Sequence, residues 1–253
     1  DATGNIRNFT YNGLGQRLAA QDLHSPNDTA FGTWTYAYDD AGNVIQTTNP
    51  KNQVVNYIYD SLNRQLTEDF AGQTGVEVSN TYDIGIDGKG RLTSYISPSL
   101  AQTNTYNALG LLKSESKVIG GNAYLTSYEY DRQGNQTLII NPDNSQVKNF
   151  YNSAGLLEKT QRKESTDVNF ADVISNFDYS PMGQITTQNY ANGSATTNTY
   201  DSSKLYRLTN KVTTIAGGLH GQDLAYTYDT VGNITKIIDS SATESAKTSQ
   251  YAY

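Results

Sequence analysis

The sequence predicts an all-β fold of repeated β-hairpins, in which units of about 24 residues form a long antiparallel sheet that curls or spirals. Three observations support this prediction. A short motif that begins with tyrosine recurs along the whole chain. Aromatic residues alternate with other residues before most copies, as expected of strands. The chain has 20 Tyr and 21 Gly but only 36% hydrophobic residues, which favours a wall one sheet thick.

The motif Tyr-[Asp/Asn]-x-x-Gly occurs six times, whereas random order of this composition predicts about 0.3 copies. The six copies span residues 11–15, 38–42, 106–110, 130–134, 151–155 and 228–232. Degenerate copies begin at positions 59, 82, 179 and 200, and residues 84–89 lengthen the turn of the second of these. The ten tyrosines that open the copies, here called anchor tyrosines, are spaced 21 to 28 residues apart, a period typical of repeat arrays.

Each copy is predicted to be the turn of a hairpin. Before the anchor, Tyr or Phe often recurs two residues earlier, which places both rings on one face of a strand. After it, Asp or Asn can bond the backbone two residues on, and a residue that tolerates the left-handed conformation closes the turn. That residue is Gly in most copies and Asn63 in one. The predicted structural anchors are Tyr11, Tyr38, Asp39, Gly42, Tyr59, Asp60, Tyr82, Asp83, Tyr106, Gly110, Tyr130, Asp131, Gly134, Tyr151, Gly155, Tyr179, Gly183, Tyr200, Asp201, Tyr228, Asp229 and Gly232.

A second turn lies between several consecutive copies, at residues 49–52, 141–144 and 191–194. Two turns per unit imply two strands per unit and therefore about 20 strands, which would extend ~100 Å as one flat sheet. Because open sheets seldom exceed about 10 strands without curling, we expect the strip to coil with its aromatic stripe inside. Residues 158–171 are charged and poor in β-branched side chains, so they are predicted to be either a short helix or a solvated excursion.

The repeat runs from end to end, so residues 1–253 are predicted to be a single array. The sequence begins and ends within a repeat, and we therefore expect a fragment of a longer repeat region in which Tyr precedes Asp1 and Asp or Asn follows Tyr253. A strip cut within a repeat exposes open strand edges. We expect end-to-end self-association from these edges.

Composition excludes several classes of protein. The chain is 11% aromatic and has a net charge of −7, which argues against disorder. No apolar run approaches the ~20 residues of a membrane helix, and no signal peptide is present, so any export signal would lie outside this sequence. A sequence pI of about 4.8 without a basic cluster argues against nucleic acid as a partner. The absence of cysteine removes disulfides, thiolate metal sites and thiol nucleophiles.

The Tyr-Asp-x-x-Gly-Asn copies at 38–43, 130–135 and 228–233, together with the Asn-Pro second turns, resemble the YD repeats of the rearrangement-hotspot (RHS) family. That family includes bacterial polymorphic toxins, the C component of ABC toxin complexes, wall-associated proteins and teneurins. The resemblance implies a hairpin strip that spirals into a hollow shell, which in toxin members encloses a C-terminal toxic domain. The self-cleaving core module of those members has no counterpart here, since no Asp-Pro-x-Gly stretch occurs.

The recurrent acids are candidates for catalytic or metal-binding groups. Two carboxyls of a glycosidase lie either ~5 Å or ~6.5 to 9.5 Å apart, and carboxyls on neighbouring turns are candidates for such a pair. Turn capping already explains Asp39, Asp60, Asp131, Asp201 and Asp229, so we expect no catalysis. Residues 83–88 resemble the start of a calcium loop, but Gly85 and Ser94 stand where it needs an oxygen ligand and a bidentate Glu. A widened turn is the preferred interpretation, and no cofactor or metal is expected.

Other candidate residues receive structural interpretations. His24 and His220 are predicted to be solvated loop residues. Trp34 alternates with Tyr36 and Tyr38 and is assigned to packing of the aromatic stripe, with sugar or peptide stacking as the alternative.

The preferred function is a non-catalytic segment of an RHS shell, secreted or at the cell surface, whose partners are the remaining repeats and an enclosed polypeptide. The alternative is an extracellular adhesin or carbohydrate-binding module that binds a cell-surface glycan or protein through its polar outer face or through long turns such as 67–81 and 213–225. A glycosidase is a distant third hypothesis.

Overall fold

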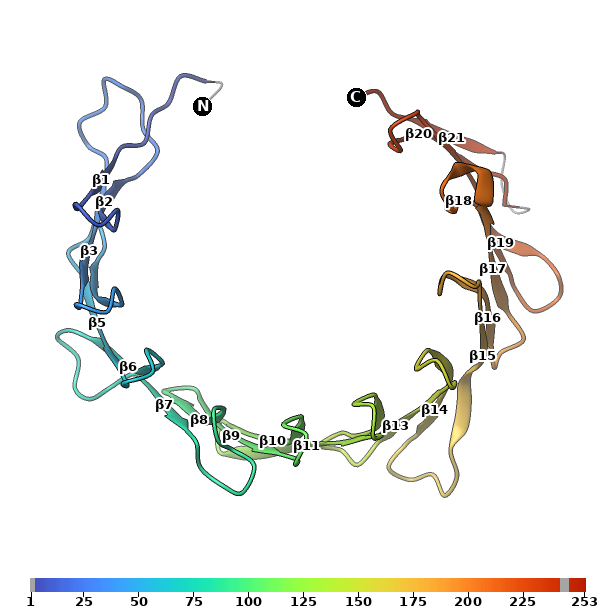
Figure 1. Cartoon of the computed structure of the whole chain (residues 1–253), viewed down its shortest axis with the longest axis horizontal. Coiled ribbons are helices and arrows are strands. Elements are labelled where there is room, and N and C mark those ends of the chain that lie inside the picture. Colours follow the sequence, from blue (N-terminus) through green and yellow to red (C-terminus); the bar gives the residue numbers. More distant parts are fainter. Residues whose placement is uncertain (1–2, 242–245) are drawn as a thin grey trace. The chain divides into compact units, whose positions relative to one another are not determined.

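The protein is all-β, as predicted. The structure is a computed structural model that describes residues 3–241 and 246–253. It divides into two compact units, residues 1–125 and 126–253, each of which is a bent strip of consecutive hairpins (Figure 1). The 21 described strands agree with the expected number of about 20.

Unit 1 is an antiparallel succession in which every strand from β1 to β10 pairs with the next one in sequence. Strand β11 (Asn122–Tyr130) begins at the end of this unit. The other strands of unit 1 are β1 (Phe9–Tyr11), β2 (Arg17–Gln21), β3 (Thr33–Tyr38), β4 (Val44–Thr48), β5 (Val54–Tyr59), β6 (Gln65–Phe70), β7 (Val78–Tyr82), β8 (Leu92–Ser97), β9 (Leu100–Tyr106) and β10 (Leu112–Ile119).

Unit 2 repeats the same antiparallel pattern from β11 to β21. Its strands after β11 are β12 (Gln136–Ile140), β13 (Gln146–Tyr151), β14 (Leu157–Lys163), β15 (Ala171–Tyr179), β16 (Ile185–Tyr190), β17 (Ala195–Asp201), β18 (Arg207–Thr214), β19 (His220–Tyr228), β20 (Ile234–Asp239) and β21 (Lys247–Gln250).

A single turn of 3-10 helix, η1 (Ser202–Lys204), follows β17 where the motif lacks its glycine. Leu205 and Tyr206 take the left-handed conformation instead, with φ of 57° and 55°. Within the described residues, no helix has the length and apolar character of a membrane span.

The turns have the predicted backbone. In the Tyr38 copy, the amide of Asp39 donates to the Asn43 carbonyl at 3.0 Å and that of Gly42 to the Asp39 carbonyl at 3.1 Å. Gly42 has φ of 89°, a conformation that costs an L-residue about 1 to 2 kcal/mol. Asn63 replaces glycine at φ 59°, as expected. The ladder register shifts at Tyr38, which is a β-bulge at the entry to the turn.

The second turns are also confirmed, with Asn52, Asn144 and Gly193 at φ of 60°, 65° and 83°. The widened turn forms between Asp83 and Arg91, whose backbones are joined by an amide-to-carbonyl bond of 3.1 Å. Two turns therefore alternate along the strip.

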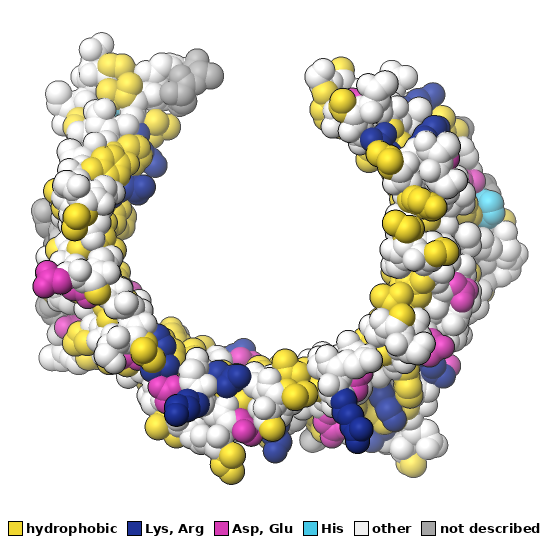
Figure 2. Space-filling view, in the orientation of Figure 1, with side chains coloured by type: hydrophobic (Ala, Val, Ile, Leu, Met, Phe, Trp, Pro, Cys, Tyr) yellow, Lys and Arg dark blue, Asp and Glu magenta, His cyan; other side chains and the backbone are white. Residues whose placement is uncertain are grey.

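Each unit is a single layer of sheet with very little buried apolar surface. Among the described residues, Ala20 (8% exposed) is the one buried hydrophobic side chain, whereas His24, Thr93, Asn104 and Thr196 are buried polar residues. Figure 2 shows hydrophobic side chains spread over the visible face among polar ones. Hydrophobic burial therefore contributes less here than in an ordinary domain, and hydrogen bonding must specify the fold.

Three predictions about local structure were wrong in part. Residues 158–171 contain no helix, because residues 157–163 form β14, paired on both sides by β13 and β15, and this pairing overrides their helical propensity. Only residues 164–170 form an excursion, of which 165–169 are exposed. The long turns at 67–81 and 213–225 are mostly strand, and only 71–77 and 215–219 lie between strands.

The prediction for His24 was wrong: it is 7% exposed. Its Nδ1 lies 2.7 Å from the Asp22 carbonyl oxygen, and its ring stacks on Phe31 at 3.9 Å. Residues 22–32 fold back on themselves and cover it, an arrangement that periodicity does not encode. His220 opens β19 rather than lying in a loop, with Nδ1 3.4 Å from an Asp223 carboxylate oxygen.

End-to-end association stays a prediction, and β21 supplies its test. The Tyr251 amide donates to the Thr235 carbonyl in the hairpin of β20 and β21 at 3.0 Å, so alternate residues such as Thr248 direct their amides outward. We expect light scattering to show mass that rises with concentration. Thr248→Pro should reduce this rise, because it removes an edge donor. A monomer at every concentration would contradict the prediction.

Candidate functional site: the tyrosine-anchored turns

Within each unit, anchor tyrosines join consecutive hairpins. In the described residues, eight anchor hydroxyls donate to a main-chain carbonyl at the start of the preceding hairpin's return strand. Their distances run from 2.5 Å for Tyr179 to 3.1 Å for Tyr82. The pairs are Tyr38 to Arg17, Tyr59 to Val44, Tyr82 to Gln65, Tyr106 to Leu92, Tyr151 to Gln136, Tyr179 to Leu157, Tyr200 to Ile185 and Tyr228 to Leu208.

These hydroxyls act where the backbone ladder between hairpins stops. Between β16 and β17, for example, the pairs run from Asn189↔Ala195 to Thr187↔Thr197, and Ile185 lies two residues beyond the last of them. Its carbonyl accepts from Tyr200 Oη at 3.0 Å instead. Since an unsatisfied carbonyl in a partly buried site costs about 1 to 3 kcal/mol, the phenol compensates for the divergence of the strands.

Asparagine two residues before the anchor supports this bond in four repeats. Asn198 Nδ2 donates to the same Ile185 carbonyl at 2.9 Å. Asn80, Asn104 and Asn149 bond the carbonyls of Gln65, Leu92 and Gln136 in the same way. Sequence reasoning noticed only the aromatic residues at this position. The signal that was missed is Asn-x-Tyr, which stands where Tyr-x-Tyr or Phe-x-Tyr is absent.

Burial raises the pKa of several anchors, among them Tyr59, Tyr151, Tyr179, Tyr200 and Tyr228, above the ordinary value of 10.0. A raised phenol pKa keeps the hydroxyl protonated. These side chains therefore remain donors throughout the neutral and mildly alkaline range.

The residue after each anchor caps the turn. Asp131 Oδ1 accepts the amides of Gln133 at 2.8 Å and Asn135 at 2.9 Å, so it reaches four residues on as well as the expected two. Hydrogen bonding, first that from the Asn135 side chain, holds the pKa of Asp131 below its usual value. Asp39, Asp60 and Asp229 bond the turn similarly, and Asp201 caps η1 through the Ser203 amide. These acids are structural groups in the described geometry.

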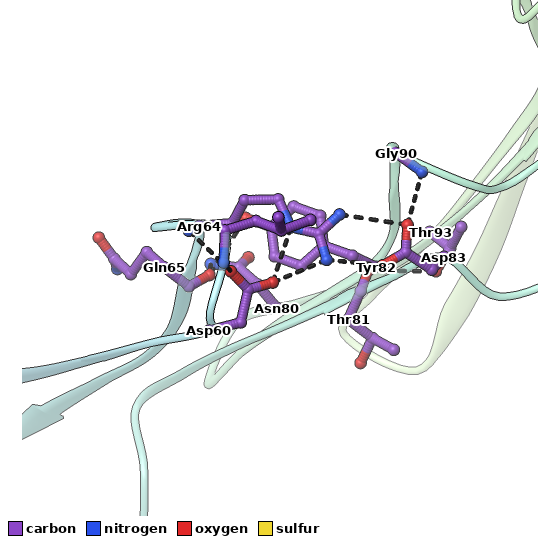
Figure 3. Close-up of polar contacts among 10 residues, drawn as sticks. Asp60, Arg64, Gln65, Asn80, Thr81, Tyr82, Asp83, Gly90 and Thr93 are labelled. Atoms are coloured by element: carbon purple, nitrogen blue, oxygen red, sulfur yellow. Dashed lines mark hydrogen bonds and ion pairs between the residues drawn. The ribbon is translucent and has the colours of Figure 1, made fainter.

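The residue that follows the left-handed position, here called the closing residue, reaches forward to the next turn. Arg64 is the clearest case (Figure 3): its Nε donates to Asp60 at 2.7 Å in its own turn, and its Nη2 to Asp83 at 2.6 Å in the next. Its guanidinium also lies 4.3 Å from the centre of the Tyr82 ring. One side chain thus connects two turns and covers the anchor between them.

Four further closing residues make such forward contacts. Arg91 Nε donates to the Gly110 carbonyl at 3.0 Å, and its guanidinium lies 5.6 Å from the Tyr106 ring. Arg207 contacts the next anchor, Tyr228, in the same way. Asn43 donates to Asn63 at 2.9 Å, and Gln184 to the Tyr206 carbonyl at 2.9 Å. Sequence reasoning did not single out this position.

The turn glycine leaves room for these contacts. A Cβ on Gly110 would overlap the Arg91 guanidinium, and one on Gly232 would lie 2.6 Å from Arg207 Nη2. Glycine at these two positions therefore permits both positive φ and the close approach of the preceding arginine. At Gly183 the same φ of 78° occurs with open space around it.

Residues 83–88 form the widened turn that was the preferred interpretation. The Asp83 carboxylate accepts from Arg64 and from the Gly90 amide, so its charge is already matched. Within the described part of the chain, no three or more acidic or histidine side chains gather in an arrangement that would hold a metal ion.

Acid should weaken the link between the Tyr59 and Tyr82 turns. Arg64 lowers the pKa of Asp83 from 3.8 to about 2. A lowered folded-state pKa means that the carboxylate stabilises the fold above pH ~4, and that this contribution is lost as the pH falls towards about 2. Arg64→Ala should flatten the decline in urea midpoint over that range, whereas Arg132→Ala should not. Equal slopes in the two variants would contradict the assignment.

The geometry described so far defines a class of protein, a β-hairpin repeat strip with tyrosine-anchored turns. The model of the family described as RHS Repeat matches residues 38–74. The resemblance to RHS and YD-repeat proteins predicted from the sequence is thereby confirmed. A comparison with curated proteins finds no match.

Solved structures share the fold. A crystal structure of TcdB2-TccC3 superposes with a TM-score of 0.78 at 17% identity, over 92% of this chain and 13% of that one. The structure named TcdB2-TccC3-TEV gives 0.80 at 16%, over 99% and 13%. A Tc holotoxin pore of Photorhabdus luminescens gives 0.78 at 18%, over 93% and 12%. This chain thus spans about one eighth of those chains and has the fold of a segment within them.

Proposed function

We propose that the chain is a non-catalytic structural segment of an RHS-type shell that encapsulates a toxin or another polypeptide, in a secreted or cell-surface protein. The observation that carries the proposal is the single-layer strip itself. In its described residues almost no apolar side chain is buried, and hydrogen bonds join consecutive repeats within each unit. A wall that is one sheet thick needs few residues for the area that it covers, which suits a shell. Likeness in fold to a segment of the TcdB2-TccC3 chain, over nearly the whole of this chain, supports a structural segment of this type.

The non-catalytic part of the proposal rests on how the acids are used. Asp39, Asp60, Asp131 and Asp229 all accept amides of their own turns. Their pKa values are lowered, which suits capping and is opposite to the raised value of a general acid at neutral pH.

The proposal includes the organisation of the chain. Residues 1–253 are one repeat array within a longer repeat region, and the partners are the remaining repeats and the enclosed polypeptide. The anchors Tyr11 to Gly232 named above are its structural residues.

Protease protection in the complete natural protein tests the shell. We expect the polypeptide beyond the repeats to resist a broad-specificity protease until the strip unfolds. Gly110→Ala, which weakens the strip, should make that polypeptide digestible at a lower urea concentration, and the surface variant Arg132→Ala should not. Digestion at equal rates with the strip folded or unfolded would refute encapsulation.

A binding module is the second candidate, and one observation favours it. Among the described residues, the third residue after the anchor is a large apolar side chain in five turns, between 60% and 84% exposed. These residues are Leu14, Leu62, Leu109, Met182 and Val231. Exposed large apolar side chains that recur at one position of the repeat are candidates for contact with a partner. Retention of the chain on cell surfaces, lost in a variant with all five changed to serine, would support this function, and equal retention of both proteins would exclude these side chains as the binding surface.

A further inference from the structure

A slot on the first three strands combines aromatic walls with arginine. The register places Phe9 of β1 opposite Ala20 of β2, and Ala20 opposite Trp34 of β3. The smallest of the three side chains thus lies in the middle. Ala20 is 8% exposed, whereas Phe9 and Trp34 are 40% and 39% exposed. A buried floor between two exposed rings makes a slot.

The size of the slot suits one six-membered ring. Neighbouring strands are ~4.8 Å apart, and β2 lies between β1 and β3. The backbones of Phe9 and Trp34 are therefore about 10 Å from each other. A flat ring held between them needs about 7 to 8 Å, two van der Waals separations, and side-chain tilt takes up the difference. The cavity over these strands has a volume of about 270 Å³, and Tyr36 extends its aromatic lining along β3.

The positive charge of two arginines indicates which kind of ligand the slot would bind. Arg7 and Arg17 line the same cavity, and the Arg17 guanidinium lies 4.9 Å from the centre of the Phe9 ring. Among the ion pairs of the described residues, neither arginine takes part. Figure 2 shows cationic side chains beside hydrophobic ones over β1 to β3. In a chain with net charge −7, two such arginines at an aromatic slot favour an anionic ligand.

The slot also contains a group that suits hydroxyls. Asp22 lines the cavity, and its carboxylate can accept hydrogen bonds from a polyol. Gln21 borders the cavity too, but its side chain alternates to the other face of β2, where its Oε1 accepts from Asn8 Nδ2 at 2.8 Å. Asp22 would repel a ligand that carried charge alone, so the anion must also bring hydroxyl donors.

From this combination we propose that the slot binds a carboxylated saccharide, with the pyranose ring between Phe9 and Trp34 and the carboxylate on Arg7 and Arg17. The faces of a sugar ring bear C–H groups that pack on aromatic rings, and its hydroxyls can donate to the Asp22 carboxylate. An acidic peptide would use the arginines but leave the two rings without a flat partner. The proposal is independent of encapsulation, because it concerns two consecutive repeats and not the strip as a wall.

Trp34 is the only tryptophan of the chain, so its fluorescence reports on the slot. We would titrate the full chain with tri-galacturonate, free galacturonate, neutral galactotriose and a poly-glutamate peptide. Saturable change with tri-galacturonate, at least tenfold tighter than with galactotriose or poly-glutamate, is the expected result. If free galacturonate also saturates the signal, a single sugar acid is sufficient; if only the trimer does, a polymer is the ligand.

Variants distinguish binding in the slot from nonspecific attraction of an anion to surface arginines. Arg17→Ala and Ala20→Leu, the second of which fills the floor, should each weaken binding at least tenfold, whereas Arg132→Ala should not change it. Because Ala20→Leu alters a buried position, its thermal midpoint is compared with that of the parent chain. Arg7→Ala, at an exposed residue, gives a second variant that does not depend on the core. Equal affinity for acidic and neutral sugars, for poly-glutamate, or in all variants would overturn the proposal, as would no response to either galacturonate.

Discussion

Gly110→Ala is expected to lower the free energy of unfolding by about 2 to 3 kcal/mol. The positive φ accounts for about 1 to 2 kcal/mol, because an L-residue is strained there. The remainder arises because the new Cβ displaces Arg91 from the Gly110 carbonyl and from the Tyr106 ring. Urea unfolding followed by circular dichroism measures the change.

Gly183→Ala is the matched control, since Gly183 has the same φ of 78° and no atom within 4 Å of the new Cβ. This variant should lower the free energy of unfolding only by the backbone strain of the positive φ, about 1 to 2 kcal/mol. In an Arg91→Ala background, Gly110→Ala should lower the free energy of unfolding only as much as Gly183→Ala does in the parent protein. Equal costs at the two glycines in the parent protein would show that the arginine contact contributes nothing.

The double variant Asn198→Ala/Tyr200→Phe is expected to cost about 2 to 3 kcal/mol, more than its two single changes together. Both side chains donate to the Ile185 carbonyl, so either change alone leaves one donor and should cost about 0.5 to 1 kcal/mol. The double change leaves the Ile185 carbonyl without either side-chain donor. A double-mutant cycle in urea should give a coupling of about 1 kcal/mol.

Tyr228→Phe provides the comparison within the same unit. Its acceptor, the Leu208 carbonyl, has no second side-chain donor among the described contacts, since residue 226 is a tyrosine. The single change should therefore cost about 1 to 2 kcal/mol, more than Tyr200→Phe. Strictly additive energies for Asn198 and Tyr200 would mean that the two donors do not share their acceptor in solution.

Sequence was sufficient for those parts of the fold that depend on local chemistry. A left-handed residue after Asp or Asn fixes a turn, so Gly42, Asn63 and Asn144 could be placed without a structure. Contacts across strands were not predictable in this way. The acceptor of the Tyr228 hydroxyl lies 20 residues earlier, and no local pattern marks a main-chain carbonyl.

The errors have a similar cause. His24 and the segment 157–163 were judged by local polarity, but one is covered by a returning loop and the other is paired by strands on both sides. The closing residue was overlooked because it is Arg, Asn or Gln in different repeats. What these side chains share is reach and a donor, which a search for residue identity does not detect.

The forward contacts of the closing residues have a mechanical consequence. Each of these contacts joins a hairpin only to its immediate successor, so among the described residues no closing residue links distant repeats within a unit. A pulling force applied at the ends of a unit should therefore unfold its hairpins one after another, and not all at once. Each event would release about 24 residues, or roughly 8 nm of extended chain. Such a material yields gradually under load while the unopened part keeps its form.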